Sequence, residues 1–354
     1  MALFPPQLRD WSLPSECVLT PRAVERLARE AANHSAAEVA RALQRDWRMR
    51  LDGKQVQRWA NALGLRLVRE RDAEVRASES GLRPASPENP AELLVIGPDG
   101  GRVQMRERDP VTGSRWREDK IFTVSSYVLG DGKERKPEPL VTTHVASMEK
   151  TEAFGRLARV EGERRGWKQA AQVIAIADCG NWIDPLLERE FPGIPRIADW
   201  YHVAERVHAC ARAAYGPNLR QVKRRAAQWL SLLANGRATL VLARLQSESQ
   251  RLGRPRATDK EDHPRCILAH AVGYFEKNHR YMNYPEYRQK GWPIGSGNTE
   301  AGVKQFNKRV KGSERFWNES GVEAILCLRA LWLCQDGRWD RYWSSRPAYL
   351  SRAA

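Results

Sequence analysis

The chain has 354 residues, which gives room for two or three domains that each bury a core of their own. No stretch approaches the roughly 18 uncharged apolar residues that a membrane span needs, and the first residues carry no secretory signal, so we expect a soluble protein. Its six cysteines include no C-x-x-C pair, which favours reduced thiols in the cytoplasm over a disulfide framework or a zinc ribbon. The net charge of +16 indicates a polyanionic partner, with a merely basic soluble protein as the alternative.

The first unit, from residue 19 to 71, has the pattern of three short helices. Thr20-Pro21 offers an N-cap followed by proline at the first helical position, and Ser35–Glu38 and Asp52–Gln55 are capping boxes that open two further helices. The apolar stripes predicted to face inward are Val39, Ala40, Leu43 and Trp47 on the second helix and Val56, Trp59, Ala60 and Leu63 on the third, which Gly64 is expected to end.

Three short helices with a basic third one are typical of a helix-turn-helix module. On the third helix Lys54, Gln55, Arg58 and Asn61 point away from the apolar stripe, as side chains that contact bases in the major groove would. An ordinary three-helix bundle is the alternative. We therefore predict a DNA-binding module over residues 1–71, followed by a linker over residues 72–92, which are rich in Pro, Ser and Glu and have no sustained period.

The second unit begins with strands and continues with alternating strands and helices. Residues 93–97 and 102–106 are predicted to form a hairpin around an Asp99-Gly100-Gly101 turn, and residues 121–129 a third strand. A short, fully apolar strand at 173–177 and a further short strand at 195–198 alternate with helices over 151–167 and 181–191. The pattern then stays helical from Tyr201 to a Gly-rich loop at 293–297. This order predicts an α/β fold with one mixed sheet and helices on its faces.

Four acidic residues stand at positions that suit metal-dependent chemistry. Asp178 and Asp199 each follow an apolar strand, at the edge where open α/β sheets place ligands, and Glu300 opens a helix behind glycines. Taken alone, Asp99 is explained as a turn residue and Glu300 as a favourable charge at a helix N-terminus. Phosphoryl transfer with two metal ions, however, needs carboxylates from separate elements to converge. Together these acids predict such a site.

A row of basic residues follows Glu300 on the same predicted helix. Lys304, Lys308, Lys311 and Arg315 recur at a spacing of three or four, and Arg309 lies among them. Pairing of Glu300 with a lysine on a solvated face is the alternative explanation. One acid does not need four cations, so we favour a track for DNA phosphates that leads to the acidic site.

Several motifs together resemble the Kra-type insertion-sequence transposases of bacteria, which are akin to the Mutator group. The resemblance covers nearly the whole chain. It rests on the Asp-Gly-Gly segment at 99–101 and on the sequences around Asp178 (ADCGNWI) and Asp199 (IADWYHV). It also rests on GSGNTE at 295–300 with its lysines, and on the tail from Leu328-Arg329-Ala330 to Arg338-Trp339-Asp340-Arg341-Tyr342-Trp343. Cys179 departs from the family, which usually has glycine there, and makes the local turn less defined.

The resemblance implies an RNase H-like core with a DDE triad of Asp99, Asp178 and Glu300. These residues would hold two Mg²⁺ ions, which Mn²⁺ could replace. Asp199 and His202 look like the auxiliary Asp-x-x-His element of such enzymes, and Asp199 is the rival of Asp178 for the second catalytic acid. The implied core occupies 93–203 and 293–354, around a helical insertion at 204–292.

The implied activity is that of a transposase. It would bind the ends of an insertion sequence, hydrolyse the DNA backbone and join the 3′ ends to target DNA. Its partner would be double-stranded DNA, on which it would form a homodimer or larger assembly, in a bacterial cytoplasm and associated with the nucleoid. A structure-selective nuclease on the same core and a domesticated DNA-binding regulator are the alternatives.

Overall fold

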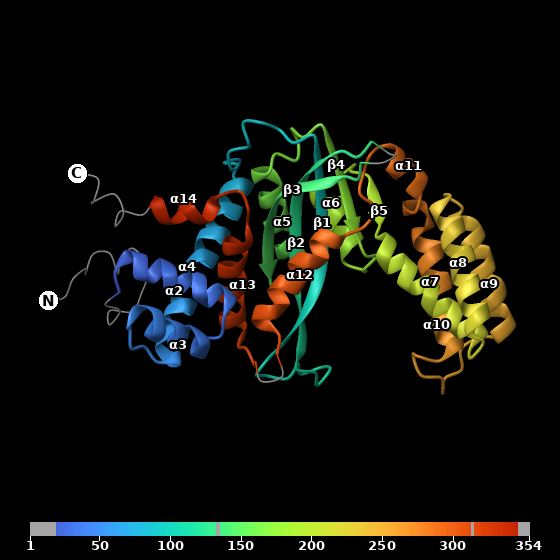
Figure 1. The fold of residues 1–354 in the computed structure, drawn as a ribbon, viewed down its shortest axis with the longest axis horizontal. Helices are drawn as coiled ribbons and strands as arrows, with labels where there is room; N and C mark the ends of the chain where they lie inside the picture. The colour runs from blue at the N-terminus through green and yellow to red at the C-terminus, as the bar shows by residue number, and fades with distance from the viewer. Residues whose placement is uncertain (1–18, 132–134, 313–314, 346–354) are drawn as a thin grey trace.

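The computed structural model describes residues 19–131, 135–312 and 315–345. It contains a five-stranded sheet in the order β3-β2-β1-β4-β5 (Figure 1). The strands are β1 (Leu93–Gln104), β2 (Trp116–Val128), β3 (Glu138–Ser147), β4 (Gln172–Ala177) and β5 (Arg196–Ala198). Pairing is antiparallel between β1 and β2 and between β2 and β3, and parallel between β1 and β4 and between β4 and β5. The predicted mixed α/β sheet is therefore confirmed.

The turn predicted at Asp99-Gly100-Gly101 is wrong, because these residues continue β1 in register with β2. A Cβ on Gly100 would lie 2.9 Å from Oε1 of Glu118, and one on Gly101 would lie 2.6 Å from Oδ1 of Asp119. The two glycines thus make room for acidic side chains of the neighbouring strand. The chain reverses later, at 109–113, where the carboxylate of Asp109 accepts backbone N–H groups.

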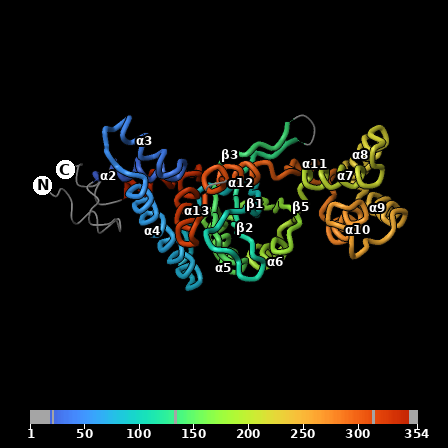
Figure 2. Tube along the Cα trace, turned by 90° about the horizontal axis from the view of Figure 1, so that it is seen from below, coloured from blue at the N-terminus to red at the C-terminus, as the bar shows by residue number. Residues whose placement is uncertain are grey.

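Helices cover both faces of the sheet (Figure 2). α5 (Thr151–Arg164) and α6 (Ile183–Glu190) lie on one face, where Phe154 and Phe191 pack with Ile96 and Phe122 of the strands. α12 (Gly297–Val310) lies on the opposite face and contacts β1 and β2. Because side chains alternate along a strand, every second residue of β1 faces α12.

The N-terminal helices are α2 (Pro21–Asn33), α3 (Ala36–Trp47) and α4 (Gly53–Glu79). Their predicted N-caps are confirmed: Thr20 caps α2, and both capping boxes form. The predicted inward residues are also buried, with the exception of Trp47, which is 45% exposed at the end of α3.

The predicted end of the third helix at Gly64 is wrong, because α4 continues to Glu79. A Cβ on Gly64 would lie 2.3 Å from the carbonyl oxygen of Ala324. This glycine, in the middle of α4, therefore lets α13 (Glu319–Leu333) pack closely against α4. The first part of the predicted linker is accordingly helical. This helical part of the segment is fixed by two contacts. Val75 is buried in the core between the sheet and α5, and the Ser78 hydroxyl donates to the Glu163 carboxylate at 2.8 Å.

The N-terminal helices share one hydrophobic core with α12, α13 and α14 (Arg338–Ser344). Figure 1 shows α13 and α14 beside the N-terminal helices at the left of the molecule. Arg329 on α13 joins these parts. Its Nη1 donates to the carbonyl of Ala32 at 2.6 Å and to Asn33 Oδ1 at 2.9 Å, and its Nε donates to the carbonyl of Gln305 at 2.8 Å. The predicted module is therefore packed against the rest of the fold and does not form a core by itself.

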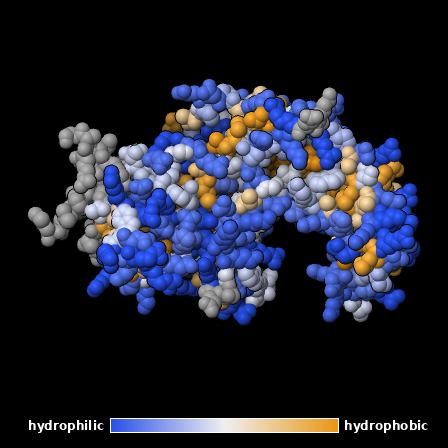
Figure 3. All heavy atoms as spheres, viewed as in Figure 1, coloured by the Kyte–Doolittle hydropathy of each residue, from blue (hydrophilic) through white to orange (hydrophobic). Residues whose placement is uncertain are grey.

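The segment predicted to be helical comprises α7 (Trp200–Tyr215), α8 (Leu219–Ala234), α9 (Ala238–Leu252), α10 (Pro264–Asn278), a 3₁₀ turn η1 (His279–Tyr281) and α11 (Tyr284–Gln289). The helices begin at Trp200, slightly before the predicted boundary at 204. They form a group at one end of the molecule, and the surface is hollowed between this group and the sheet (Figure 3). Among the described residues, no helix is long and apolar enough to cross a membrane.

Candidate active site

Three aspartates lie in one row across the sheet. Pairing of β1 with β4 ends with Ile96 beside Ala175, and the same register continued by three residues brings Asp99 beside Asp178. The register of β4 and β5 brings Asp178 beside Asp199 in the same way. Neighbouring strands are about 4.8 Å apart. The alternation of side chains places all three aspartates on the face that α12 covers.

The first turn of α12 is tied to the sheet by the polar residues of its motif. Nδ2 of Asn298 donates to the hydroxyl of Ser125 on β2 at 2.8 Å and to that of Thr142 on β3 at 2.6 Å. The hydroxyl of Thr299 lies 2.7 Å from that of Thr123, and both are buried. The motif therefore fixes the position of the helix before Glu300 is reached.

Close packing of α12 on β1 depends on a glycine. A Cβ on Gly97 would lie 1.9 Å from Oγ1 and 3.0 Å from Cβ of Thr299, so the Thr299 side chain or the helix would have to shift. Gly97 stands two residues before Asp99, and Thr299 one residue before Glu300. The same contact therefore brings the two carboxylates to one place.

Electrostatics supports this convergence. Burial raises the pKa of Asp99 to about 6, against the hydrogen bond that its carboxylate accepts from the N–H of Gly100. The charges of Asp178 and Glu300 raise the pKa of Asp99 further, and His202 lowers it. Asp99 thus lies within the fields of the two acids expected to join it. Excess negative charge in a half-buried place favours a bound cation.

The carboxylate of Asp199 is fully buried and already saturated with donors. Oδ1 accepts the backbone N–H of Tyr201 at 2.7 Å and so caps α7. Oδ2 accepts the N–H of Ser296 at 3.2 Å and also the Ser296 hydroxyl. His202 Nε2 lies 4.0 Å from the same oxygen. Asp199 therefore links β5 and α7 to the loop that precedes α12.

Asp178 is in a different state. Its side chain is half-exposed and accepts no hydrogen bond from the described residues of the chain. The backbone around Asp178 is held by Arg196, whose Nη2 donates to the carbonyl oxygen of Asp178 at 2.8 Å. The guanidinium of Arg196 also pairs with Asp184. The sequence patterns did not predict this role for Arg196. The Asp178 carboxylate is thus oriented yet free to bind a ligand.

Two sets of side chains at this site could hold a metal ion. Asp199, His202 and Glu300 each offer a ligand atom within 4.8 Å of the others. In that set Asp199 would bind the ion while its oxygens also accept hydrogen bonds from Tyr201 and Ser296. Asp99, Asp178 and Glu300 are the second set, made of carboxylates, whose oxygens are the ligands of Mg²⁺ and Mn²⁺. Among the described residues, the first set is the one that has its ligand atoms within 4.8 Å of one another.

The predicted basic row is only partly on the surface. Lys304, Lys308 and Lys311 are exposed. Lys304 forms the pair with Glu300 that was the alternative explanation, with Nζ 3.3 Å from Oε2. Nζ of Lys311 lies 5.7 Å from the centre of the Trp116 ring. The exposed lysines follow one another along α12, from the turn after Glu300 to the C-terminal end of the helix.

Arg309 does not lie on the exposed face of α12 with the lysines. It is 2% exposed, and its Nε donates to the carbonyl of Ala31 at 2.8 Å. Arg315 is half-buried and its Nη1 donates to the carbonyls of Lys308 and Arg309, which caps the end of α12. The helical period could not reveal this, because the N-terminal helices that cover Arg309 are remote in sequence.

The four residues predicted to contact bases on α4 differ in surroundings. Lys54 and Arg58 are exposed. Oε1 of Gln55 accepts the N–H of the N-cap residue, so this side chain belongs to the capping box. Asn61 accepts a hydrogen bond from Gln57 at 2.7 Å and faces a pocket between α4 and the loop after α12.

One acidic residue near the site was missed. Asp119 on β2 is fully buried, and neither carboxylate oxygen accepts a hydrogen bond from another described residue. Burial raises its pKa to about 6, and the charges of Glu118 and Asp99 raise it further. It lies in a charged stretch that starts a strand, so only its register opposite Gly101 reveals that it faces the site.

Comparisons with known proteins add little to this geometry. No family model and no curated protein matches the chain. One solved structure, titled "Drosophila P element transposase strand transfer complex", is similar over 94% of this chain and 96% of its own, with 9% identity and a TM-score of 0.38.

Proposed function

We propose that the chain is a metal-dependent DNA transposase that cuts and joins phosphodiester backbones, with Asp99, Asp178 and Glu300 as its catalytic carboxylates. The observation that carries the proposal is the convergence of these acids from β1, the end of β4 and the start of α12 on one face of the sheet. Carboxylates from separate elements that are brought close together repel one another, and Asp99, whose pKa is raised by burial and by the charges of the other two, is costly to ionise unless a cation is bound.

Each residue has a defined part in this proposal. Asp99, Asp178 and Glu300 would hold Mg²⁺ or Mn²⁺, which when bound stabilises negative charge on the attacking and leaving oxygens of the phosphodiester. Asp199 is a positioning residue that joins α7 to the loop before α12, and the free carboxylate of Asp178 makes it the second catalytic acid. His202, whose Nε2 lies 4.0 Å from Oδ2 of Asp199, would form a hydrogen bond with the DNA end.

Double-stranded DNA is the substrate that the surrounding charge fits. The exposed lysines of α12 begin one turn after Glu300 and continue to its end, so a backbone that follows them passes the acidic residues. Lys54 and Arg58 of α4 would contact the same DNA further along. On paired DNA ends the protein would act as a homodimer or larger assembly.

The test uses the inverted repeats that flank the gene as substrate, in Mg²⁺ and in Mn²⁺. Asp99→Asn, Asp178→Asn and Glu300→Gln should each reduce cleavage by at least about 10³-fold while end binding stays within about twofold, because the lysines supply the binding. Glu319→Gln, at an exposed acid of α13, is the matched control and should cleave normally. Wild-type protein that cleaves neither DNA end with either metal contradicts the proposal, and cleavage without joining would make it a nuclease.

A further inference from the structure

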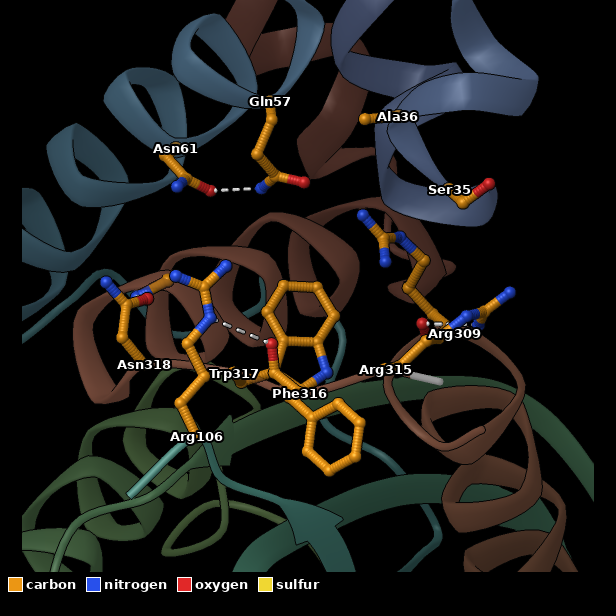
Figure 4. A pocket seen from close by; sticks show the side chains of 11 residues that line it. Ser35, Ala36, Gln57, Asn61, Arg106, Arg309, Arg315, Phe316, Trp317 and Asn318 are labelled. Atoms are coloured by element: carbon orange, nitrogen blue, oxygen red, sulfur yellow. Dashed lines mark hydrogen bonds between the residues drawn. The ribbon is translucent and has the colours of Figure 1, made fainter. Parts of the chain in front are cut away.

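A pocket of about 290 Å³ lies at the far end of α12, between the N-terminal helices and the loop that leads to α13 (Figure 4). Arg106, Arg309 and Arg315 line it. Figure 4 shows Arg106 and Arg309 on opposite sides of the Trp317 ring, with Gln57 above them. The volume is at the lower end of what small-ligand sites occupy, about 300 Å³.

The pocket is strongly positive. Three guanidinium groups line it, and none of the ion pairs between described residues involves Arg106, Arg309 or Arg315. Burial lowers the pKa of Arg309 to about 9, and the charges of Arg315 and Arg329 lower it further, while the charge of Glu38 raises it. A buried cation among like charges is unfavourable unless an anion is bound nearby.

Two helices also direct their N-termini at this pocket. Ser35 and Ala36 at the start of α3 line it, and so do Asn318 and Gly321 at the start of α13. The positive end of a helix dipole attracts anions, and phosphate above all. Glu38, the acid closest to the start of α3, is held by Ser35 in the capping box at 2.6 and 2.8 Å. The start of α13 therefore adds to the field of the guanidinium groups, whereas the Glu38 carboxylate offsets the positive end of α3.

An aromatic ring lies at the mouth of the pocket. Phe316 is 40% exposed, and the guanidinium of Arg115 lies 5.5 Å from the centre of its ring. An exposed ring beside cations is the arrangement on which proteins stack nucleic-acid bases. Gln57 and Asn61 on the opposite wall carry side-chain amides that can bond to a base edge. The pocket thus combines a phosphate site with a surface for a base.

We infer that this pocket binds one backbone phosphate of a DNA strand, with an adjacent base stacked on Phe316. The inference rests on the proposed function, because the strand is the one that passes the acids. At 1.5 Å per residue, Arg309 lies roughly 14 Å along α12 from Glu300. That is about four nucleotides at 3.4 Å each. The exposed Lys304 and Lys308 bridge the interval, which favours a continuous strand over a free nucleotide.

The experiment measures binding of the full chain to end DNA at three salt concentrations. Arg106→Ala should weaken binding about tenfold and reduce the slope of log affinity against log salt by roughly 0.9. Phe316→Ala should weaken binding about fivefold without changing the slope, because a ring contributes no ionic contact. Arg102→Ala is the matched control, since this exposed arginine of β1 faces the other side of the sheet. Its affinity should stay within about twofold of wild type.

A second arm locates the phosphate. End DNA is prepared with a neutral methylphosphonate at each position from the second to the sixth nucleotide beyond the cut. The affinity of the wild-type protein should fall when the methylphosphonate is at one position near the fourth nucleotide. At that position the methylphosphonate should not lower the affinity of Arg106→Ala any further. The inference is overturned if Arg106→Ala and Arg102→Ala bind alike, or if no single position matters to the wild-type chain.

A third arm separates the sources of the phosphate. If inorganic phosphate or a deoxynucleoside monophosphate at millimolar concentration raises the melting temperature of wild type but not of Arg106→Ala, while DNA binding of the two proteins is equal, the pocket serves a free nucleotide and the inference is overturned. The outcome is also distinct from that of the catalytic proposal. Normal cleavage with pocket variants that bind like wild type contradicts the inference alone. Pocket-dependent binding without any cleavage contradicts the catalytic proposal alone.

Discussion

Asp178 and Asp199 stand side by side at the ends of neighbouring strands, and substituting each with asparagine should have opposite consequences. Asp199 accepts three hydrogen bonds in a fully buried place, from Tyr201 N–H and from the N–H and hydroxyl of Ser296. Asp178 accepts none from the described residues. Asp199→Asn should therefore destabilise the fold, whereas Asp178→Asn should leave it intact and abolish cleavage.

The magnitude follows from the contacts. An asparagine at 199 keeps one carbonyl oxygen and presents an NH₂ group to donors on the other side. At least one charge-assisted hydrogen bond is lost, which costs about 1.5–3 kcal/mol, and a donor left unpaired costs about 1 kcal/mol more. We expect the free energy of unfolding to fall by roughly 2–4 kcal/mol for Asp199→Asn. For Asp178→Asn it should change by less than about 0.5 kcal/mol, as at a surface position.

Urea unfolding followed by circular dichroism measures both values, with cleavage assayed on the same preparations. Ser296→Ala provides a further comparison, because it removes the hydroxyl that donates to Asp199 and keeps the backbone N–H. In a double-mutant cycle the Asp199 and Ser296 changes should be coupled by more than about 0.5 kcal/mol. An Asp199→Asn protein that is as stable as wild type yet inactive would refute the reasoning and make Asp199 the second catalytic acid.

Three further predictions concern the packing, pH dependence and charge of the molecule. Gly97→Ala should displace α12 through the clash with Thr299 and lower the free energy of unfolding by about 1–3 kcal/mol, with cleavage lost and DNA binding kept. Thr299→Ala in the same chain should restore part of the activity. Cleavage by Gly97→Ala at the wild-type rate would contradict this. Burial alone would raise the pKa of Glu161, but Arg338 and Arg164 outweigh it and hold the pKa below 4.5, so this group stabilises the fold above about pH 4.5 and the contribution is lost as the pH falls below that value. Glu161→Gln should cost about 3–5 kcal/mol at pH 7 and make urea unfolding less dependent on pH between 5 and 3, whereas an unchanged acid slope would exclude this role. Replacing Lys304 and Lys308 by alanine should weaken binding to all DNA sequences alike and reduce the salt slope by up to about 1.8, with Lys150→Ala on the opposite face as the control; an unchanged slope would mean that these lysines serve only pairs such as the one with Glu300.

The features that the sequence determined by itself are those that depend on near neighbours. The capping boxes at Ser35 and Asp52 form because the bonded groups are three residues apart. An apolar run of strand length located β4, and a short strand pattern located β5, and hence the acids that follow them. Of the candidate site, the strand-end positions of Asp178 and Asp199 and the helix-start position of Glu300 were accessible in this way.

Tertiary structure decided what depends on partners remote in the chain. Asp99 joins the site because β2 pairs alongside it and turns an Asp-Gly-Gly turn signal into strand. Gly64 is a packing position because α13 lies against it, and Arg309 is buried because α2 covers it. The difference between a saturated Asp199 and a free Asp178 likewise depends on Ser296, which is far along the chain. A periodic pattern records which face of an element is apolar, but not which distant donors, backbones or charges will meet it.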